Sequence, residues 1–273
     1  MFSQAIQEME QSGQLVSEPR SFKVYIEQQG LGNKRTADYI SVQSYAGLHP
    51  ELKEAGYTVL RLGAPQGSKH THFALAKVQN GWSDFFLIDE EIFSGQPVET
   101  FVPSESAQDL LAFQLLPNLT ETSLVNLALA SGLLPKALGI TTKTQTIPAT
   151  GQSTFSFDFK PLHNSPTVLG HQNGQVEIDA LFVGQRDGKK CLFVVEAKSG
   201  KKLDSLAKQK LLYPVLAIKQ SVPIDMPVIP VYLRTIRKGD AIEFNIAECD
   251  FHGEEALSNM MVKQVKCYSL YGF

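Results

Sequence analysis

The sequence predicts an α/β protein in which a mixed central sheet is flanked by helices and preceded by a smaller α+β domain. Two nearly continuous apolar runs, Gln175–Val183 and Lys190–Ala197, are typical of central strands that are covered on both faces. After them, Leu203–Ile218 repeats its apolar residues with a helical period. A polar segment with two prolines, Ser94–Ser104, favours a domain boundary near residue 100.

The length and composition fit two ordinary globular domains. The chain has 273 residues, and single hydrophobic cores stop growing at roughly 250. We therefore expect an N-terminal α+β domain over residues 1–100 and a second domain over residues 101–273. Hydrophobic residues make up 43% of the chain and charged residues 19%, which excludes extended disorder, collagen-like repeats and coiled coils.

The location of the protein follows from the cysteines and the apolar segments. Three distant cysteines without a Cys-x-x-Cys pattern argue against a disulfide scaffold or a structural zinc site and indicate a reducing cytoplasm. The longest apolar segment, Leu124–Ile140, contains Asn126 and Pro135 and is too short to span a bilayer. The N-terminus has no basic region followed by an apolar stretch, so we expect neither a signal peptide nor membrane association.

The N-terminal domain alternates between helical and strand patterns and ends in a hairpin signal. Asn80-Gly81, the pair that a type I′ turn prefers, separates the apolar runs Phe73–Val78 and Trp82–Ile88. Helices followed by a hairpin outline a winged-helix unit, and also many other small α+β domains. The preceding elements are expected to be a helix over Gln4–Leu15, a strand or helix start over Phe22–Glu27, short helices over 42–45 and 48–53, a strand over Tyr57–Leu62 and a loop over Gly63–His72.

The second domain begins with helices and continues with strands. Pro214 lies inside the helical pattern of Leu203–Ile218, so this helix is expected to kink or end early. The other elements expected here are helices over Glu105–Leu116 and Glu121–Gly139, a polar linker over Thr141–Ser153, and strands over Ser153–Lys160, Val228–Leu233 and Ile242–Ala247.

Charged residues lie within the two apolar strands of the second domain. Because side chains alternate along a strand, Glu177 and Asp179 share one face of the first strand, and Glu196 and Lys198 share one face of the second. Buried charges call for partners. Carboxylates that converge from two strands suit Mg²⁺, and a neighbouring lysine can orient or deprotonate a water or neutralise a phosphate. A surface ion pair at the end of the sheet is the alternative.

Asp179 followed by Glu196-Ala197-Lys198 after sixteen residues resembles the signature of the PD-(D/E)xK nuclease superfamily. The resemblance covers roughly residues 105–247 and implies a restriction-endonuclease-like core. It implies that Asp179, Glu196 and the carbonyl of Ala197 hold Mg²⁺, which Mn²⁺ can replace, and that Lys198 is the catalytic lysine. The residue before Asp179 is Ile178, where the name of the family has proline.

Further candidates follow from the same resemblance. Glu121 matches a glutamate that many members carry on the helix before the sheet, as a catalytic residue and metal ligand; an ordinary acid at a helix N-terminus is the alternative. Glu177 has no fixed role and either faces solvent or binds a second metal. Gln209 and Tyr213 match a Gln-x-x-x-Tyr pattern of exonuclease-like branches, and an exposed Gln with a half-buried Tyr is at least as good an interpretation.

Basic residues gather around this region. Residues 186–219 contain nine basic and three acidic residues, a local charge of +6 in a chain of net charge −3, which suits a phosphate backbone. Lys201 and Lys202, directly after the Glu196-Ala197-Lys198 motif, are candidate DNA contacts. In the N-terminal domain the candidates are Lys34, Arg35 and Lys69.

Together these features predict a Mg²⁺-dependent endonuclease of double-stranded DNA, most similar to a type II restriction endonuclease that acts as a homodimer. The N-terminal domain would read DNA or mediate dimerisation. Two alternatives remain at this point: a repair or recombination nuclease that reads DNA structure, and a DNA-binding protein with a vestigial nuclease fold.

Overall fold

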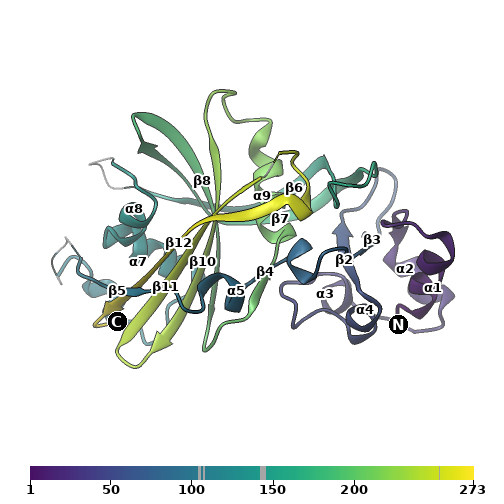
Figure 1. Cartoon of the computed structure of the whole chain (residues 1–273), viewed down its shortest axis with the longest axis horizontal. Coiled ribbons are helices and arrows are strands. Elements are labelled where there is room, and N and C mark those ends of the chain that lie inside the picture. Colours follow the sequence, from purple (N-terminus) through teal and green to yellow (C-terminus); the bar gives the residue numbers. More distant parts are fainter. Residues whose placement is uncertain (104–105, 107, 142–145, 252) are drawn as a thin grey trace.

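A seven-stranded mixed sheet forms the centre of the molecule in the computed structural model (Figure 1), which describes residues 1–103, 106, 108–141, 146–251 and 253–273. The order is β5-β12-β11-β10-β8-β7-β6; the β8–β10 and β12–β5 pairs are parallel and the other pairs antiparallel. The strands are β5 (Val98–Phe101), β6 (Ala149–Phe159), β7 (Leu169–Arg186), β8 (Lys189–Gly200), β10 (Val228–Lys238), β11 (Ala241–Phe251) and β12 (Met260–Tyr271). The predicted mixed α/β class is confirmed.

Helices cover both faces of this sheet. Val231 and Leu233 of β10 point into one hydrophobic cluster together with residues of α7 (Glu121–Ala130) and α8 (Leu133–Ala137). The intervening Tyr232 points into the other cluster, which includes residues of α9 (Gln209–Lys219). This alternation is the period of two of a strand buried on both faces, and it explains the continuous apolar runs of the sequence.

The predicted helix over Glu121–Gly139 is split in two. The Thr120 side chain accepts a hydrogen bond from the Ser123 amide and caps the start of α7. Gly132, with a φ of 80°, interrupts the helix between α7 and α8. The predicted helix over 105–116 appears as α6 (Leu111–Gln114), and its predicted start at Glu105 lies outside the described residues. The predicted linker over 141–153 likewise includes residues outside them, and its last part belongs to β6.

The predicted helix over Leu203–Ile218 starts later and does not end at Pro214. Residues Ser205–Ala207 form β9, which pairs antiparallel with β4 (Phe86–Ile88). Helix α9 then begins at Gln209 and continues past Pro214 to Lys219. The two-stranded β4–β9 sheet joins the N-terminal region to the segment that follows β8.

The N-terminal region contains a three-stranded sheet in the order β1-β3-β2 (right of Figure 1). Its hairpin is β2–β3, and the prediction of a hairpin around Asn80-Gly81 is wrong. Both the Gln79 and the Asn80 amides donate to the Asp84 carboxylate, and a 3-10 turn over Trp82–Asp84 follows. The elements are α1 (Ser3–Ser12), β1 (Arg20–Ser21), α2 (Phe22–Gln28), α3 (Thr36–Tyr39), α4 (Pro50–Ala55), β2 (Tyr57–Leu62), β3 (His72–Lys77) and, after β4, α5 (Asp89–Phe93).

One hydrophobic cluster extends from the N-terminal region into the large sheet. It contains Phe22 and Leu60 as well as Leu211 of α9 and Tyr232 of β10. β5, which spans the predicted boundary at residue 100, pairs with β12 at the edge of the large sheet. The division at this boundary stays a prediction. Among the described residues, no helix has the length and apolar character that crossing a membrane requires.

Candidate active site

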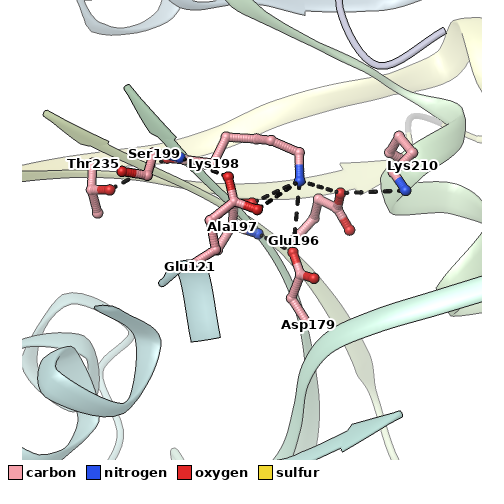
Figure 2. Close-up of polar contacts among 8 residues, drawn as sticks. All are labelled: Glu121, Asp179, Glu196, Ala197, Lys198, Ser199, Lys210 and Thr235. Carbon is pink, nitrogen blue, oxygen red and sulfur yellow. Dashed lines mark hydrogen bonds and ion pairs between the residues drawn. The ribbon is translucent and has the colours of Figure 1, made fainter. Parts of the chain in front are cut away.

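The β7–β8 ladder ends where the candidate acidic residues begin. Its last pair is Ala180 with Val195, and the next residues, Asp179 and Glu196, lie where the two strands separate (Figure 2). The Ala197 amide, no longer bonded to β7 backbone, donates to Oδ2 of Asp179 at 2.9 Å. The Asp179 side chain therefore replaces the backbone pairing between β7 and β8 at this point. The carboxylates lie where the two strands have separated.

Lys198 occupies the centre of this gap. Its Nζ lies 2.9 Å from Oε1 of Glu196, 3.3 Å from Oε2 of Glu121 and 3.9 Å from Oδ2 of Asp179. Nζ also donates to the Ala197 carbonyl at 2.9 Å. Three carboxylates and a backbone oxygen thus surround one ammonium group, as Figure 2 shows.

Glu121 reaches the site from the first turn of α7. Its Oε1 accepts a hydrogen bond from the Ser199 amide at 2.9 Å, and its Oε2 accepts one from Lys198. An acid is favourable at a helix N-terminus because of the helix dipole. Here it also ties the helix to β8, so Glu121 lies in the cluster that the resemblance implies.

Glu196 is the most deeply buried member of the group. Its side chain is only 2% exposed, and its Oε1 accepts no hydrogen bond of good geometry although two lysines are near. The second lysine is Lys210 of α9, whose Nζ lies 3.8 Å from Oε1. Burial raises the pKa of Glu196 to about 7, against the attraction of Lys210 and Lys198. Burial alone would lower the pKa of Lys198, but the surrounding carboxylates outweigh it and raise that pKa.

We name this group the carboxylate–lysine cluster: Glu121, Asp179, Glu196, Lys198 and Lys210. When Glu196 is ionised, its three carboxylates face two ammonium groups, so one negative charge is uncompensated. Oxygen donors and excess negative charge fit a hard divalent cation such as Mg²⁺, which takes one or two carboxylates and keeps several waters. As the side chains stand, no three His, Cys, Asp or Glu residues in the described chain form a ready metal cage.

Three other candidates lie beside the cluster and do not join it. Glu177, Gln209 and Tyr213 line a neighbouring cavity between β7, α9 and the N-terminal region. Both members of the Gln-x-x-x-Tyr pattern bond to N-terminal backbone: Gln209 Nε2 donates to the Val42 carbonyl at 3.3 Å, and Tyr213 Oη donates to the Arg61 carbonyl at 3.1 Å. Both side chains are buried, so the alternative interpretation, an exposed Gln with a half-buried Tyr, is wrong.

The basic candidates are exposed or partly exposed, and among the described residues those of the N-terminal region form no hydrogen bond or ion pair with the site. Lys201 and Lys202 are exposed in the segment directly after β8. Lys69 is exposed in the loop between β2 and β3. Arg35 forms an exposed ion pair with Asp38, and the Lys34 ammonium lies 5.9 Å from the centre of the Tyr39 ring.

The sequence interpretation missed Lys210 as a site residue. It counted Lys210 only as part of a basic segment. Its proximity to Glu196 depends on where α9 begins, and that start is set by the pairing of β9 with β4. The available signal was its place beside Gln209 on the helix that follows the Glu196-Ala197-Lys198 motif.

Comparison with known proteins gives one match. Residues 93–269 match the family model of a domain of unknown function (DUF6997). No curated protein and no solved structure gives a significant match. The matched range is more than half of the 273 residues and contains the whole carboxylate–lysine cluster. The chain therefore belongs to the family of the domain of unknown function DUF6997.

Proposed function

We propose that this chain is a Mg²⁺-dependent nuclease that hydrolyses phosphodiester bonds of double-stranded DNA. The observation that carries the proposal is the convergence of Glu121, Asp179 and Glu196, from one helix and two strands, on the ammonium group of Lys198. This arrangement unites the residues of the PD-(D/E)xK-like motif in one place. It has the acidic excess that a metal needs and the cation that a phosphate needs.

The roles of the side chains follow from their places. Asp179, Glu196, Glu121 and the Ala197 carbonyl would hold Mg²⁺ or, in its place, Mn²⁺. When bound, the ion would supply Lewis-acid stabilisation of the phosphate and a water of lowered pKa. Lys198, held in the cluster by Glu121, would orient the attacking water and neutralise charge on the phosphate oxygens. Its raised pKa favours the protonated form, which donates hydrogen bonds and does not act as a base.

The N-terminal region supports a DNA partner. Helices, a short β1 and the β2–β3 hairpin, with the sheet order β1-β3-β2, match the outline of a winged-helix unit. The loop between β2 and β3 carries Lys69 and takes the place of the wing. We propose that this region reads DNA sequence and that the protein works as a homodimer, as a type II restriction endonuclease does.

The alternatives are less well supported. A repair nuclease would be favoured by Gln209 and Tyr213 in the catalytic centre, but both side chains bond to N-terminal backbone. A vestigial nuclease would have no need for an uncompensated carboxylate group around a lysine, because such a group costs stability without a metal.

The decisive experiment is plasmid cleavage with and without Mg²⁺. The wild-type protein is expected to cut, and Asp179→Asn, which keeps an oxygen for the Ala197 amide, to cut at least roughly 10³-fold more slowly. Asp187→Asn, at the exposed turn at the other end of the β7–β8 hairpin, is the matched control and is expected to cut normally. Discrete fragments indicate a restriction enzyme and resection indicates a repair nuclease. Binding without cleavage rejects the proposal.

A further inference from the structure

A cavity of about 70 Å³ adjoins the carboxylate–lysine cluster. It lies between the N-terminal region and the large sheet, and its lining includes Arg61 of β2, Glu177 of β7, and Gln209 and Lys210 of α9. Lys210 belongs to both places, because its Nζ is 3.8 Å from Oε1 of Glu196. The cavity therefore touches the candidate active site through Lys210 and has room for several water-sized groups.

Arg61 is a half-buried cation in this cavity without an acidic partner. In the described parts of the chain, no carboxylate lies within ion-pair distance of its guanidinium group. Burial lowers the pKa of Arg61, with an opposing contribution from Tyr213, but an arginine remains charged at every physiological pH. A cation that is partly removed from water without a counter-ion favours the binding of an anion.

The position of Arg61 is fixed relative to α9. Tyr213 Oη donates to the Arg61 carbonyl at 3.1 Å, and the Gln209 amide group bonds to Val42. Two residues after Arg61, Gly63 packs so closely on the backbone of β7 that a Cβ atom there would lie 2.0 Å from the Gln172 carbonyl oxygen. These contacts fix the backbone of Arg61 beside the cavity that its side chain lines.

The start of α9 adds positive potential on the same side. Gln209 and Lys210 occupy its first turn, where backbone amides have no partner within the helix and the dipole is positive. Gln209 is also buried, and its Nε2 is already used by the Val42 carbonyl, so the side chains that can meet an anion here are Arg61 and Lys210. Among the described residues that line the cavity, Glu177 is the one acid, against Arg61 and Lys210.

We propose that Arg61 and Lys210 form a subsite for a backbone phosphate of DNA next to the phosphate that is cleaved at the carboxylate–lysine cluster. This inference rests on the proposed nuclease function and adds to it a residue from outside the motif-bearing sheet. The N-terminal region then contributes directly to the active site and aligns the bound strand, since phosphate contacts position a nucleic acid.

The test is DNA binding in EDTA, where no cleavage occurs, measured by fluorescence anisotropy of a labelled duplex over a range of salt concentrations. Arg61→Gln and Lys210→Gln are each expected to lower affinity several-fold and to reduce the slope of log K against log salt by about 0.9, the loss of one phosphate contact. Arg61→Lys keeps the positive charge and is expected to keep most of the slope of log K against log salt. Lys266→Gln changes an exposed lysine of β12, outside the basic segment 186–219, and serves as the matched control that keeps the wild-type affinity.

Thermal unfolding of each variant confirms that it is folded. Wild-type affinity and slope in both Arg61→Gln and Lys210→Gln would overturn the subsite, as would a wild-type protein that binds no DNA. The two proposals fail separately: a protein that loses the predicted phosphate contacts on substitution but never cleaves retains the subsite and loses the nuclease function. A wild-type protein that cleaves DNA, with Arg61→Gln and Lys210→Gln variants that bind DNA as the wild type does, retains the nuclease function and loses the subsite.

Discussion

Two groups of buried charges lie on neighbouring strands of the large sheet, and they differ in how well they are compensated. One is the carboxylate–lysine cluster. The other joins Asp89 of α5 to Tyr232 and Arg234 of β10, and Arg234 is directly beside Lys198 in the β8–β10 register. Asp89 is fully buried and accepts hydrogen bonds from the Asp204 amide at 2.8 Å and the Tyr232 hydroxyl at 2.9 Å, with Arg234 Nε 3.3 Å away.

The difference distinguishes a structural charge from a functional one. Both oxygens of Asp89 accept hydrogen bonds, and one acid faces one cation. In the carboxylate–lysine cluster three acids share two lysines. The carboxylate–lysine cluster has fewer cations than acids and lies beside a cavity, so it is the better candidate for binding a cationic ligand.

The largest expected effect on stability is at the compensated group. Asp89→Ala leaves Arg234 buried without its acid and is expected to lower the free energy of unfolding by about 3 to 5 kcal/mol. Asp38→Ala, which breaks the exposed pair with Arg35, is the matched control and costs less than about 0.5 kcal/mol. Urea denaturation measures both. Equal losses in the two variants would remove the distinction between a buried and an exposed ion pair.

A third buried charge extends the comparison. Lys208 is 4% exposed, its Nζ bonds only weakly to the Ser258 carbonyl at 3.5 Å, and burial lowers its pKa to about 8. Because this pKa is below that of the unfolded chain, the unfolded state binds more protons between about pH 8 and 10.5, and wild-type stability rises across that window. Lys208→Met is expected to stabilise the protein by about 3 kcal/mol at pH 7.

The pH dependence is the sharper part of that test. The advantage of Lys208→Met over the wild type is expected to shrink towards zero as pH rises from 8 to 10.5, in denaturation curves recorded at each pH. Lys190→Met changes an exposed lysine and is expected to give no such trend. If the difference in stability between Lys208→Met and the wild type stayed constant with pH, packing and not the charge of Lys208 would be its cause.

The smallest expected change in stability is that of Glu196→Gln, which is expected to stabilise the protein where Asp89→Ala destabilises it. Glu196→Gln removes a buried charge whose pKa is raised by burial to about 7. Since the folded state binds more protons between about pH 4.5 and 7, stability falls as pH rises through that window. In EDTA at pH 8, Glu196→Gln is expected to raise the free energy of unfolding by about 2 kcal/mol, with the gain closing below pH 5. A loss of stability would place Glu196 with Asp89 as a structural residue.

The centre of the site could be predicted from local patterns. Alternation along two strands places Asp179, Glu196 and Lys198 near one another, because charges at alternate positions of apolar strands share a face. Glu121 needed the motif resemblance, since an acid at a helix start is common. Lys210 and Arg61 could not be placed, because their positions depend on the docking of the N-terminal region, a contact between segments far apart in the sequence.

The errors in the fold have the same origin. Asn80-Gly81 has the local chemistry of a hairpin turn, but the Asp84 side chain accepts the Gln79 and Asn80 amides, and the following strand finds its partner in β9. The predicted helix start at Leu203 is too early for the same reason, because residues 205–207 pair with β4. Propensity is overridden where a distant segment supplies backbone partners.

The shared core has a consequence for synthesis on the ribosome. Asp89 gains its Tyr232 partner only after 143 more residues have been made, and Val42 meets Gln209 after 167. At roughly 5 to 20 residues per second, the first hundred residues wait on the order of ten seconds with an incomplete apolar surface. The N-terminal segment thus reaches its final packing late, although it is synthesised before its partners.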